Sequence, residues 1–532
     1  MDGNFDKSKL FFLDMPLCQS QTAEQTQQIP LPDGMGDVGR ILCAFPQVIA
    51  RGKEWMADRV SFSGGVMVWV LYEPEGGGPV QCIDAWLPFQ MKWDLPEGME
   101  EGSIRIRCLP RFVDARSVSA RKIMVRVGLS AMAEAFCPGV QEVFTPAEVP
   151  QDVELLQNTY PIRIAREAGE KSFSLDEDLT LPDAAPQAER ILSFRLNPRV
   201  TDKKVMTDKV VFRGNGQLHV LYQAEDGTLH SWDFDLPFSQ YADLNQGHSP
   251  DAQAEFIPMT TSLELDLDEE GHLRLKAGLV AQYLITDKEQ LSVIEDAYSP
   301  TRELDIQMEQ LQIPAILENR RENLYGEQTI PGQPARIADV SFLPDLPRQQ
   351  RQENGVTLEM PGTFQVLYYG EDGKLNSATA RWEQELQLNA ADQSMINANP
   401  IPSQPQAMPG SGQILVKTEI PLELTTTTRQ TIPMATGVVP EQQRTLDPNR
   451  PTLILRRAGN ESLWNIAKAS GSTVDAIRRA NHLEEDPTPG QMLLIPVSCH
   501  NAPPGAFLFC PFPARVPEIF LVGLDRKWYN NR

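Results

Sequence analysis

The sequence has few cysteines, and none of them is placed to build a disulfide framework or a zinc site. Its 532 residues include seven cysteines, an odd number, and no two form a Cys-x-x-Cys pair. Disulfide-rich domains and zinc modules need closely spaced thiols in regular patterns. Disulfides also persist mainly in oxidising compartments. The sequence therefore favours a reducing compartment.

Long apolar runs are also missing. No segment approaches the roughly 20 consecutive apolar residues that span a bilayer as a helix. The short run Leu10–Leu13 is too brief for the core of a signal peptide and is followed at once by Asp14. We expect a soluble protein that is made in the cytoplasm and has no membrane insertion.

The sequence has fewer basic than acidic residues. The chain has 48 Lys and Arg against 72 Asp and Glu, a formal net charge of −24. Nucleic-acid binding depends on neutralising phosphates and releasing their counterions, and an acidic surface repels phosphate instead. We therefore expect no nucleic-acid partner.

The motifs of common catalytic sites do not occur. We find no His-Glu-x-x-His, no Gly-x-Ser-x-Gly, and no glycine-rich phosphate loop with its lysine. His219 and His230 share a predicted hairpin, but no third ligand type accompanies them, so we predict no metal site. The sequence predicts neither enzyme activity nor a cofactor.

What the sequence does contain is a repeat. The letters Val-Leu-Tyr close three alternating apolar segments, and their tyrosines stand at positions 72, 222 and 368. Each copy runs into a turn, and the second and third turns carry Asp226-Gly227 and Asp372-Gly373. An Asp-Gly pair between alternating apolar segments is a strong hairpin signal. The nearly equal spacing indicates a triplicated domain.

Each copy continues with further alternating segments and almost no helical periodicity. The segments 123–129, 273–277 and 414–418 correspond to one another. This pattern predicts tandem antiparallel β-sandwich or barrel-like domains. The predicted organisation is an N-terminal arm over 1–40, a first repeat over 41–150, a connecting segment with the second repeat over 151–334 (core 191–300), a degenerate third repeat over 335–440, a linker over 441–452, a small domain over 453–497 and a Pro-rich tail over 498–532.

Some segments keep two interpretations open. The arm could lend a strand to the first repeat. Residues 142–146 are echoed by 296–300, and these stretches, with the amphipathic segments after them, could be connecting strands or short helices. We expect the threonine run Thr425–Thr428 to belong to a linker.

Near the C-terminal end the periodicity changes to that of helices. Leu453–Leu455 reads as a strand, and Ser462 is placed to cap a first helix that ends at Gly471. A second helix follows, and Met492–Pro496 reads as a closing strand. The predicted order is strand–helix–helix–strand, or βααβ.

Residues 453–497 resemble a LysM module. The resemblance implies binding of N-acetylglucosamine-containing glycans in a shallow groove between two loop regions, although some LysM modules bind proteins instead. The usual Gly-Asp-Thr/Ser-Leu is here Gly459-Asn460-Glu461-Ser462-Leu463, which is one residue longer. The residues that the resemblance places in the binding loops are Gly459, Asn460, Glu461, Ser462, Asn481, His482, Leu483, Pro489, Gly490 and Gln491.

Two of the module's polar or aromatic residues have simpler interpretations. Trp464 could stack on a sugar, but at an internal helical position it is predicted to belong to the core. Asn481 could contact a ligand, but capping the end of a helix is the commoner role for asparagine.

The repeats are similar to the SPOCS domain of endospore-forming Firmicutes, which often occurs in tandem ahead of one LysM. The resemblance rests on the Val-Leu-Tyr strand, its turn and the outgoing Leu87-Pro88-Phe89 and Leu236-Pro237-Phe238. It implies a non-enzymatic protein of the spore coat or envelope, made in the mother cell and acting at the forespore surface. Its LysM would hold a coat-assembly protein or peptidoglycan. The alternatives are a glycan-binding protein without a sporulation role and a wall hydrolase, and the hydrolase would need a catalytic domain.

Overall fold

The computed structural model describes residues 4–150, 152–353, 355–391, 394–401, 403–444 and 451–497. The predicted Pro-rich tail 498–532 and residues 445–450 of the predicted linker lie outside the described residues. Strands dominate the described chain, and its two helices both lie in the βααβ module.

The strands fall into three successive units, which we call the first, second and third unit. The first has β1 Asn4–Pro30, β2 Val38–Trp55, β3 Arg59–Pro74, β4 Gln81–Asp94, β5 Ser103–Ser119 and β6 Lys122–Glu148. The second has β7 Glu154–Leu179, β8 Ala188–Val205, β9 Lys209–Ala224, β10 Leu229–Asp243, β11 Gln253–Leu267 and β12 Leu273–Tyr298.

The third unit is divided into more and shorter strands than the other two. It has β13 Arg302–Pro331, β14 Pro334–Pro344, β15 Arg348–Gln352, β16 Gly355–Gly370, β17 Leu375–Leu388, β18 Met395–Pro400, β19 Gln406–Gly410 and β20 Gln413–Gln443. The βααβ module follows with β21 Leu453–Arg457, α1 Leu463–Ser470, α2 Val474–Asn481 and β22 Met492–Pro496.

The three units repeat one antiparallel topology. In the first, β2-β3-β4 form one sheet and β1-β6-β5 a second. The second unit has β8-β9-β10 and β7-β12-β11, and the third has the same arrangement with extra short strands on β16 and β20. The predicted fold class, mainly β with antiparallel sandwich or barrel-like domains and a small βααβ module, is confirmed.

Each unit encloses its own apolar core between its two sheets. In the first unit Val66, Val68 and Val70 of β3 pack in one cluster with Val125 and Val127 of β6. Alternate residues of a strand point to the same face, so these valines are the buried face that the alternating sequence pattern predicts. The second and third units have corresponding clusters.

The turn after the second Val-Leu-Tyr shows why glycine stands there. Asp226 Oδ1 accepts the amide of Thr228 at 2.9 Å, and the Ala224 amide donates to the Thr228 carbonyl at 2.9 Å. Gly227 between them has φ +80°, which residues with a Cβ rarely adopt. The Asp-Gly pair therefore closes the β9–β10 hairpin as the sequence predicts.

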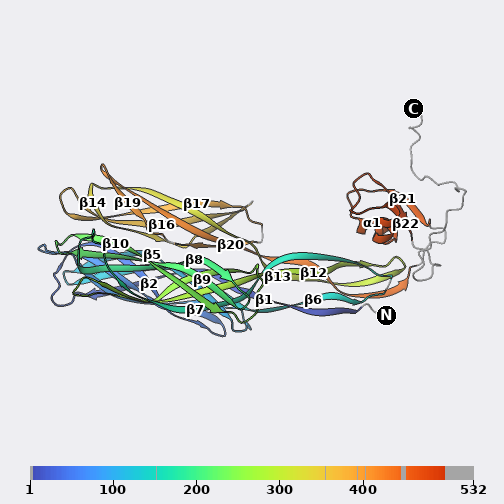
Figure 1. The fold of residues 1–532 in the computed structure, drawn as a ribbon, viewed down its shortest axis with the longest axis horizontal. Helices are drawn as coiled ribbons and strands as arrows, with labels where there is room; N and C mark the ends of the chain where they lie inside the picture. Colours follow the sequence, from blue (N-terminus) through green and yellow to red (C-terminus); the bar gives the residue numbers. More distant parts are fainter. Residues whose placement is uncertain are drawn as a thin grey trace, which may run out of the picture.

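The units also share a core with one another. Leu71, Leu221 and Leu367, the leucines of the three Val-Leu-Tyr copies, lie in a single buried cluster together with Trp69 and Leu229. All three leucines are 0 or 1% exposed. The sheets β2-β3-β4, β8-β9-β10 and β14-β16-β17 therefore meet at this cluster, and the three units form one body, seen at the left of Figure 1.

A stalk extends from this body. The outer parts of the pairs β1/β6, β7/β12 and β13/β20 run beyond the body side by side. One cluster joins them, with Phe144 from β6, Ile162 and Leu291 from the second unit, and Leu311 and Ile432 from the third. Figure 1 shows the stalk in the middle of an elongated molecule, with the βααβ module at the far end.

Two of the open interpretations concern the stalk. The segment expected as an arm contains β1, which pairs along its length with β6. The echoed stretches around 142–146 and 296–300 are ends of β6 and β12, so the structure has strands there and not helices.

The prediction that Thr425–Thr428 belong to a linker is wrong, because these residues lie inside β20 and pair with β13. Polar threonine favours strands through its branched Cβ.

Among the described residues, no helix is long and apolar enough to cross a membrane.

Candidate functional site

The βααβ module is held to the tip of the stalk by a mixed polar and aromatic contact. Trp464 of α1 donates from Nε1 to Asp296 Oδ2 at 2.9 Å, and Lys468 places Nζ 2.7 Å from the same oxygen. The rings of Trp464 and Tyr298 pack edge to face with centroids 4.7 Å apart. Tyr298 also donates its hydroxyl to the Ser472 carbonyl at 3.0 Å. The end of β12 therefore forms the docking surface.

Burial at this contact is nearly complete for the aromatic residues. Tyr298 is 2% and Trp464 8% exposed. Burial disfavours the charged phenolate and raises the pKa of Tyr298, and the neighbouring carboxylates of Glu154 and Asp296 raise it further. The hydroxyl therefore remains a hydrogen-bond donor. The prediction that Trp464 belongs to the core is confirmed, and part of that core is supplied by the stalk.

Replacing Asp296 by alanine is expected to release the module from its fixed position. The change removes the acceptor of the Trp464 indole and the partner of Lys468, which weakens docking by about 1–3 kcal/mol. Small-angle scattering should show a broader distribution of long interatomic distances. Asp475→Ala, at an exposed carboxylate of α2, is the control and should leave the scattering curve unchanged. A curve for Asp296→Ala identical to that of the wild type would argue against this docking surface.

Two of the predicted loop regions are brought together by backbone hydrogen bonds. The Ala458 amide donates to the Gln491 carbonyl at 2.8 Å, and the Gly490 amide donates to the Ala458 carbonyl at 2.8 Å. Gly459 and Asn460 follow directly and are exposed, as are Pro489 and Gly490. The loop before α1 and the turn before β22 therefore form one exposed edge of the module.

The side chains of the first loop also serve the fold. Ser462 caps α1 by accepting the Asn465 amide at 3.3 Å. Glu461 pairs with Arg456 of β21. Gln491 accepts the Thr488 amide at 3.1 Å, which fixes the turn from inside. These polar side chains stabilise the loop conformations. The backbone of Gly459, Asn460 and Gly490 beside them remains exposed to solvent.

The third predicted region is tied to strand β22. The Asn481 amide donates to the carbonyls of Ile477 at 2.8 Å and Leu494 at 2.6 Å, and its oxygen accepts the Leu494 amide at 2.7 Å. His482 ends α2 with φ 53° and is exposed, and Leu483 packs partly into the module core. The Asn481 side chain is therefore occupied in joining α2 to β22.

The body holds a buried polar cluster at equivalent positions of the three units. Arg105, with 3% side-chain exposure, pairs with Glu134 at 2.7 Å and with Glu255 of the second unit at 3.3 Å. Asn397 of the third unit donates to Glu134, and Thr425 donates to Glu255 at 2.7 Å. The cluster links all three units where the body passes into the stalk.

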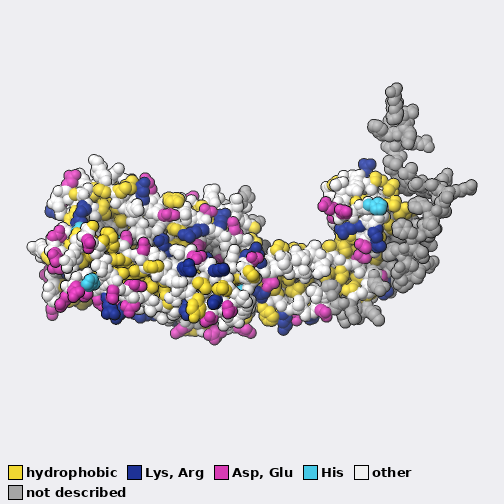
Figure 2. Space-filling view, in the orientation of Figure 1, with side chains coloured by type: hydrophobic (Ala, Val, Ile, Leu, Met, Phe, Trp, Pro, Cys, Tyr) yellow, Lys and Arg dark blue, Asp and Glu magenta, His cyan; other side chains and the backbone are white. Residues whose placement is uncertain are grey.

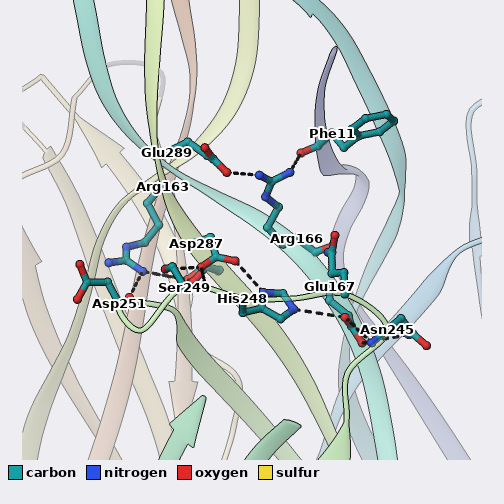
Figure 3. Close-up of polar contacts among 12 residues, drawn as sticks. Phe11, Arg163, Arg166, Glu167, Asn245, His248, Ser249, Asp251, Asp287 and Glu289 are labelled. Atoms are coloured by element: carbon teal, nitrogen blue, oxygen red, sulfur yellow. Dashed lines mark hydrogen bonds and ion pairs between the residues drawn. The ribbon is translucent and has the colours of Figure 1, made fainter. Parts of the chain in front are cut away.

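A second buried network lies within the second unit, and Figure 3 shows its geometry. His248 is fully buried, with Nδ1 2.7 Å from Asp287 Oδ2 and Nε2 3.4 Å from Glu167. Ser249 donates its hydroxyl to Asp287 Oδ1 at 2.8 Å. A nucleophilic serine needs its hydroxyl bonded to the base, and here it is bonded to the acid. Both nitrogens of His248 are taken, so this set holds a loop on β7 and β12.

The two histidines considered for a metal site do not share ligands. His219 lies between Asp233 at 2.7 Å and Asp339 at 2.6 Å, whereas His230 contacts Thr228 and Arg336. Within the described residues, no group of three or more His, Cys, Asp or Glu is placed to hold a metal ion.

Sequence reasoning missed the docking residues Asp296 and Tyr298. The only signal was their echo of Glu142 and Phe144, which marks a repeated strand end but not its partner. The cluster around Arg105 was also missed, because its members come from three units and none carries a local motif.

Comparison with known families identifies two parts of the chain. The family model described as SipL, SPOCS domain, matches residues 187–268, which include β9 and its Val-Leu-Tyr. The LysM domain model matches residues 459–496. No curated protein and no solved structure matches the chain.

Both matches agree with the geometry. The SPOCS match falls on β8–β11 of the second unit, and the LysM match covers both helices of the terminal module. SPOCS domains are typical of sporulation proteins, and LysM domains are typical of glycan-binding proteins. The chain therefore contains a SPOCS domain in its second unit and a LysM domain in its terminal module.

Proposed function

We propose that this protein is a non-enzymatic assembly protein of the spore coat or envelope. Its three-unit body serves as an acidic scaffold, and its LysM domain anchors it to a coat-assembly protein or to peptidoglycan. It acts from the mother-cell cytoplasm at the forespore surface. The observation that carries the proposal is the position of the LysM domain at the tip of the stalk, with two of its predicted loops exposed.

The arrangement separates two tasks. The LysM domain contacts the stalk through Trp464, Lys468 and Ser472. Gly459, Asn460 and Gly490 lie outside that contact and are exposed. A ligand can therefore reach these loops while the domain stays docked. The body and its net negative charge remain free for other contacts, and several weak contacts on one chain raise avidity.

The polar clusters support a structural role over a catalytic one. The Arg105 and His248 networks are internally hydrogen-bonded and buried. A catalytic base must have a nitrogen or oxygen free to reach the substrate proton. In both networks the charged atoms are taken up by other protein groups.

Removing residues 451–497 is expected to abolish localisation to the forespore in a sporulating host while the body still folds. Fluorescence microscopy of a tagged truncation gives the localisation, and circular dichroism of the purified truncation gives the strand content. Asp296→Ala is a useful control, because it disturbs docking but keeps the LysM loops. Normal forespore localisation of the truncation would refute the anchoring role.

A pull-down distinguishes the two anchors. Retention on purified peptidoglycan that is competed by chitin oligomers would assign the LysM to glycan. Retention on isolated coat-assembly protein, without effect of the oligomers, would assign it to a protein partner. Retention on neither would contradict the proposal.

A further inference from the structure

Two adjoining cavities open inside the body. The first, of about 190 Å³, is lined by equivalent segments of all three units, including Gln47, Leu196 and Phe342. The second, of about 500 Å³, lies between the second and third units. They share Arg107, Lys203 and Glu423 in their walls. Together they are as large as the pocket of a small metabolite.

The charge of the walls is opposite to that of the protein. Seven Lys and Arg residues line the two cavities, against the two carboxylates Glu255 and Glu423. The chain as a whole has a net charge of −24. Figure 2 shows Lys and Arg side chains gathered where the body borders the stalk. A positive hollow in an acidic molecule concentrates anions.

Arg107 lines both cavities, and it is the most deeply buried of these cations. It is 6% exposed, and among the described residues no carboxylate lies within 4.0 Å of its guanidinium. Within the described part of the chain, its hydrogen bonds are two long ones from Nη1, of 3.4 Å to Asn397 and to the Ala398 carbonyl. Its Nε has no partner. A buried, unpaired guanidinium is costly to the fold.

The pKa of Arg107 reflects this position. Burial disfavours the charged form and lowers the pKa to about 10, and the positive charge of Arg105 adds to the effect against the nearby carboxylates. The guanidinium is therefore still charged at neutral pH, although no carboxylate of the described residues pairs with it directly.

Arg199 shows the same pattern in the wall of the first cavity. It lines the first cavity, its Nε is buried without a partner, and no carboxylate pairs with it in the described part of the chain. At the second cavity, Lys204 and Arg321 are exposed and likewise have no ion-pair partner among described residues. Four cations without an ion-pair partner among the described residues thus line the two adjoining cavities.

A third cavity shows the contrast. It is larger, about 810 Å³, and also contains arginines. There, however, Arg105 pairs with Glu134, Arg111 with Asp345 and Arg429 with Asp14. Its charges are balanced within the protein, so nothing in it calls for an external anion.

We propose that the double cavity around Arg107 binds a small molecule with two or more carboxylate or phosphate groups. One anionic group would lie against Arg107 and Arg199 in the first cavity. A second would lie against Lys204 and Arg321 in the second cavity. Guanidinium groups bind both kinds of oxyanion in a forked geometry. The apolar wall residues Phe256, Ile257 and Met259 leave room for a short carbon skeleton between them.

Calorimetric titration of the full chain with citrate and with pyrophosphate tests this site and separates the two chemistries. We expect at least one of them to bind with a dissociation constant below about 1 mM. Arg107→Gln should weaken that binding about tenfold or more, because a charge-assisted hydrogen bond is lost. Arg107→Lys, which keeps the charge, should recover part of it.

Arg116→Gln is the matched control. Arg116 lies on the same strand as Arg107 but is 70% exposed in its side chain and pairs with Asp114, so the substitution should leave binding unchanged. If Arg107→Gln does not fold, Arg199→Gln takes its place with the same expectation. Absence of binding by both probes, or binding that the cavity variant leaves as strong as in the wild type, would overturn the proposal.

Discussion

Replacing Leu221 by alanine is expected to destabilise the entire three-unit body, by about 2–5 kcal/mol. Leu221 is fully buried in the cluster that also contains Leu71 and Leu367. Its truncation leaves a cavity where all three units meet, and surrounding side chains can fill it only in part. Each unit would lose packing, although the substitution lies in the second.

The shared cluster around Leu221 also predicts a single unfolding transition for the body. If the shared cluster couples the units, then urea unfolding followed by tryptophan fluorescence and by circular dichroism should give coincident curves. Leu221→Ala should shift both together. Leu317→Ala is the control, because Leu317 of β13 is 54% exposed, and the free energy of unfolding should change by less than about 0.5 kcal/mol. Separate transitions, only one of them shifted, would show that the units are independent.

The buried face of each unit could be predicted from sequence, whereas the shared core could not. Alternating residues such as Val66, Val68 and Val70 reveal a strand with one buried face. A signal for the other face was present, because Val70-Leu71-Tyr72 is an uninterrupted apolar triplet, and such triplets indicate a strand buried on both sides. The sequence does not say what covers the second face. In the structure the other two units cover it.

A similar limit applies to the candidate site. The LysM domain is built from neighbouring residues, so caps such as Ser462 and turns such as Gly490 can be recognised in the sequence. Asp296, which holds Trp464, lies far away in the chain and in another domain. The cavity around Arg107 is assembled from all three units. Local patterns carry no information about which distant side chains will meet.

The second large effect is expected at the contact between the second and third units. Asp339 of β14 has 1% side-chain exposure, and its carboxylate lies 2.6 Å from His219 Nε2 and 3.4 Å from Arg195 Nη2. Asp339→Asn removes the negative charge and leaves Arg195 and His219 buried without it. Breaking a buried ion pair from one side costs about 3–5 kcal/mol.

The pH dependence follows from two opposite pKa shifts. Burial opposes ionisation of Asp339, but the charges of His219 and Arg195 outweigh it, so the pKa of Asp339 is lowered. For His219, burial and the positive charge of Arg195 both act to lower the pKa. The carboxylates of Asp339 and Asp233 outweigh these two effects, so the pKa of His219 is raised. Gln404 also reaches Nδ1 of this ring, at 3.0 Å.

The two shifts bound a window of pH. A lowered carboxyl pKa contributes stability above its unfolded value of about 4 and loses it as the pH falls through the folded value. A raised histidine pKa contributes stability below about 6.5 and loses it as the pH rises through the folded value. The pair should therefore stabilise the body most between about pH 4 and 6.5.

Chemical denaturation of the wild type and of Asp339→Asn at several pH values measures this directly. The difference in the free energy of unfolding should be largest near pH 6 and should fall as the pH rises through the raised pKa of His219, because only Arg195 then still needs the carboxylate. Asp84→Asn, at an exposed carboxylate of β4, should show little difference at any pH. A penalty for Asp339→Asn that stays constant across this range would mean that His219 is not charged beside Asp339, and that Arg195 alone accounts for the contact.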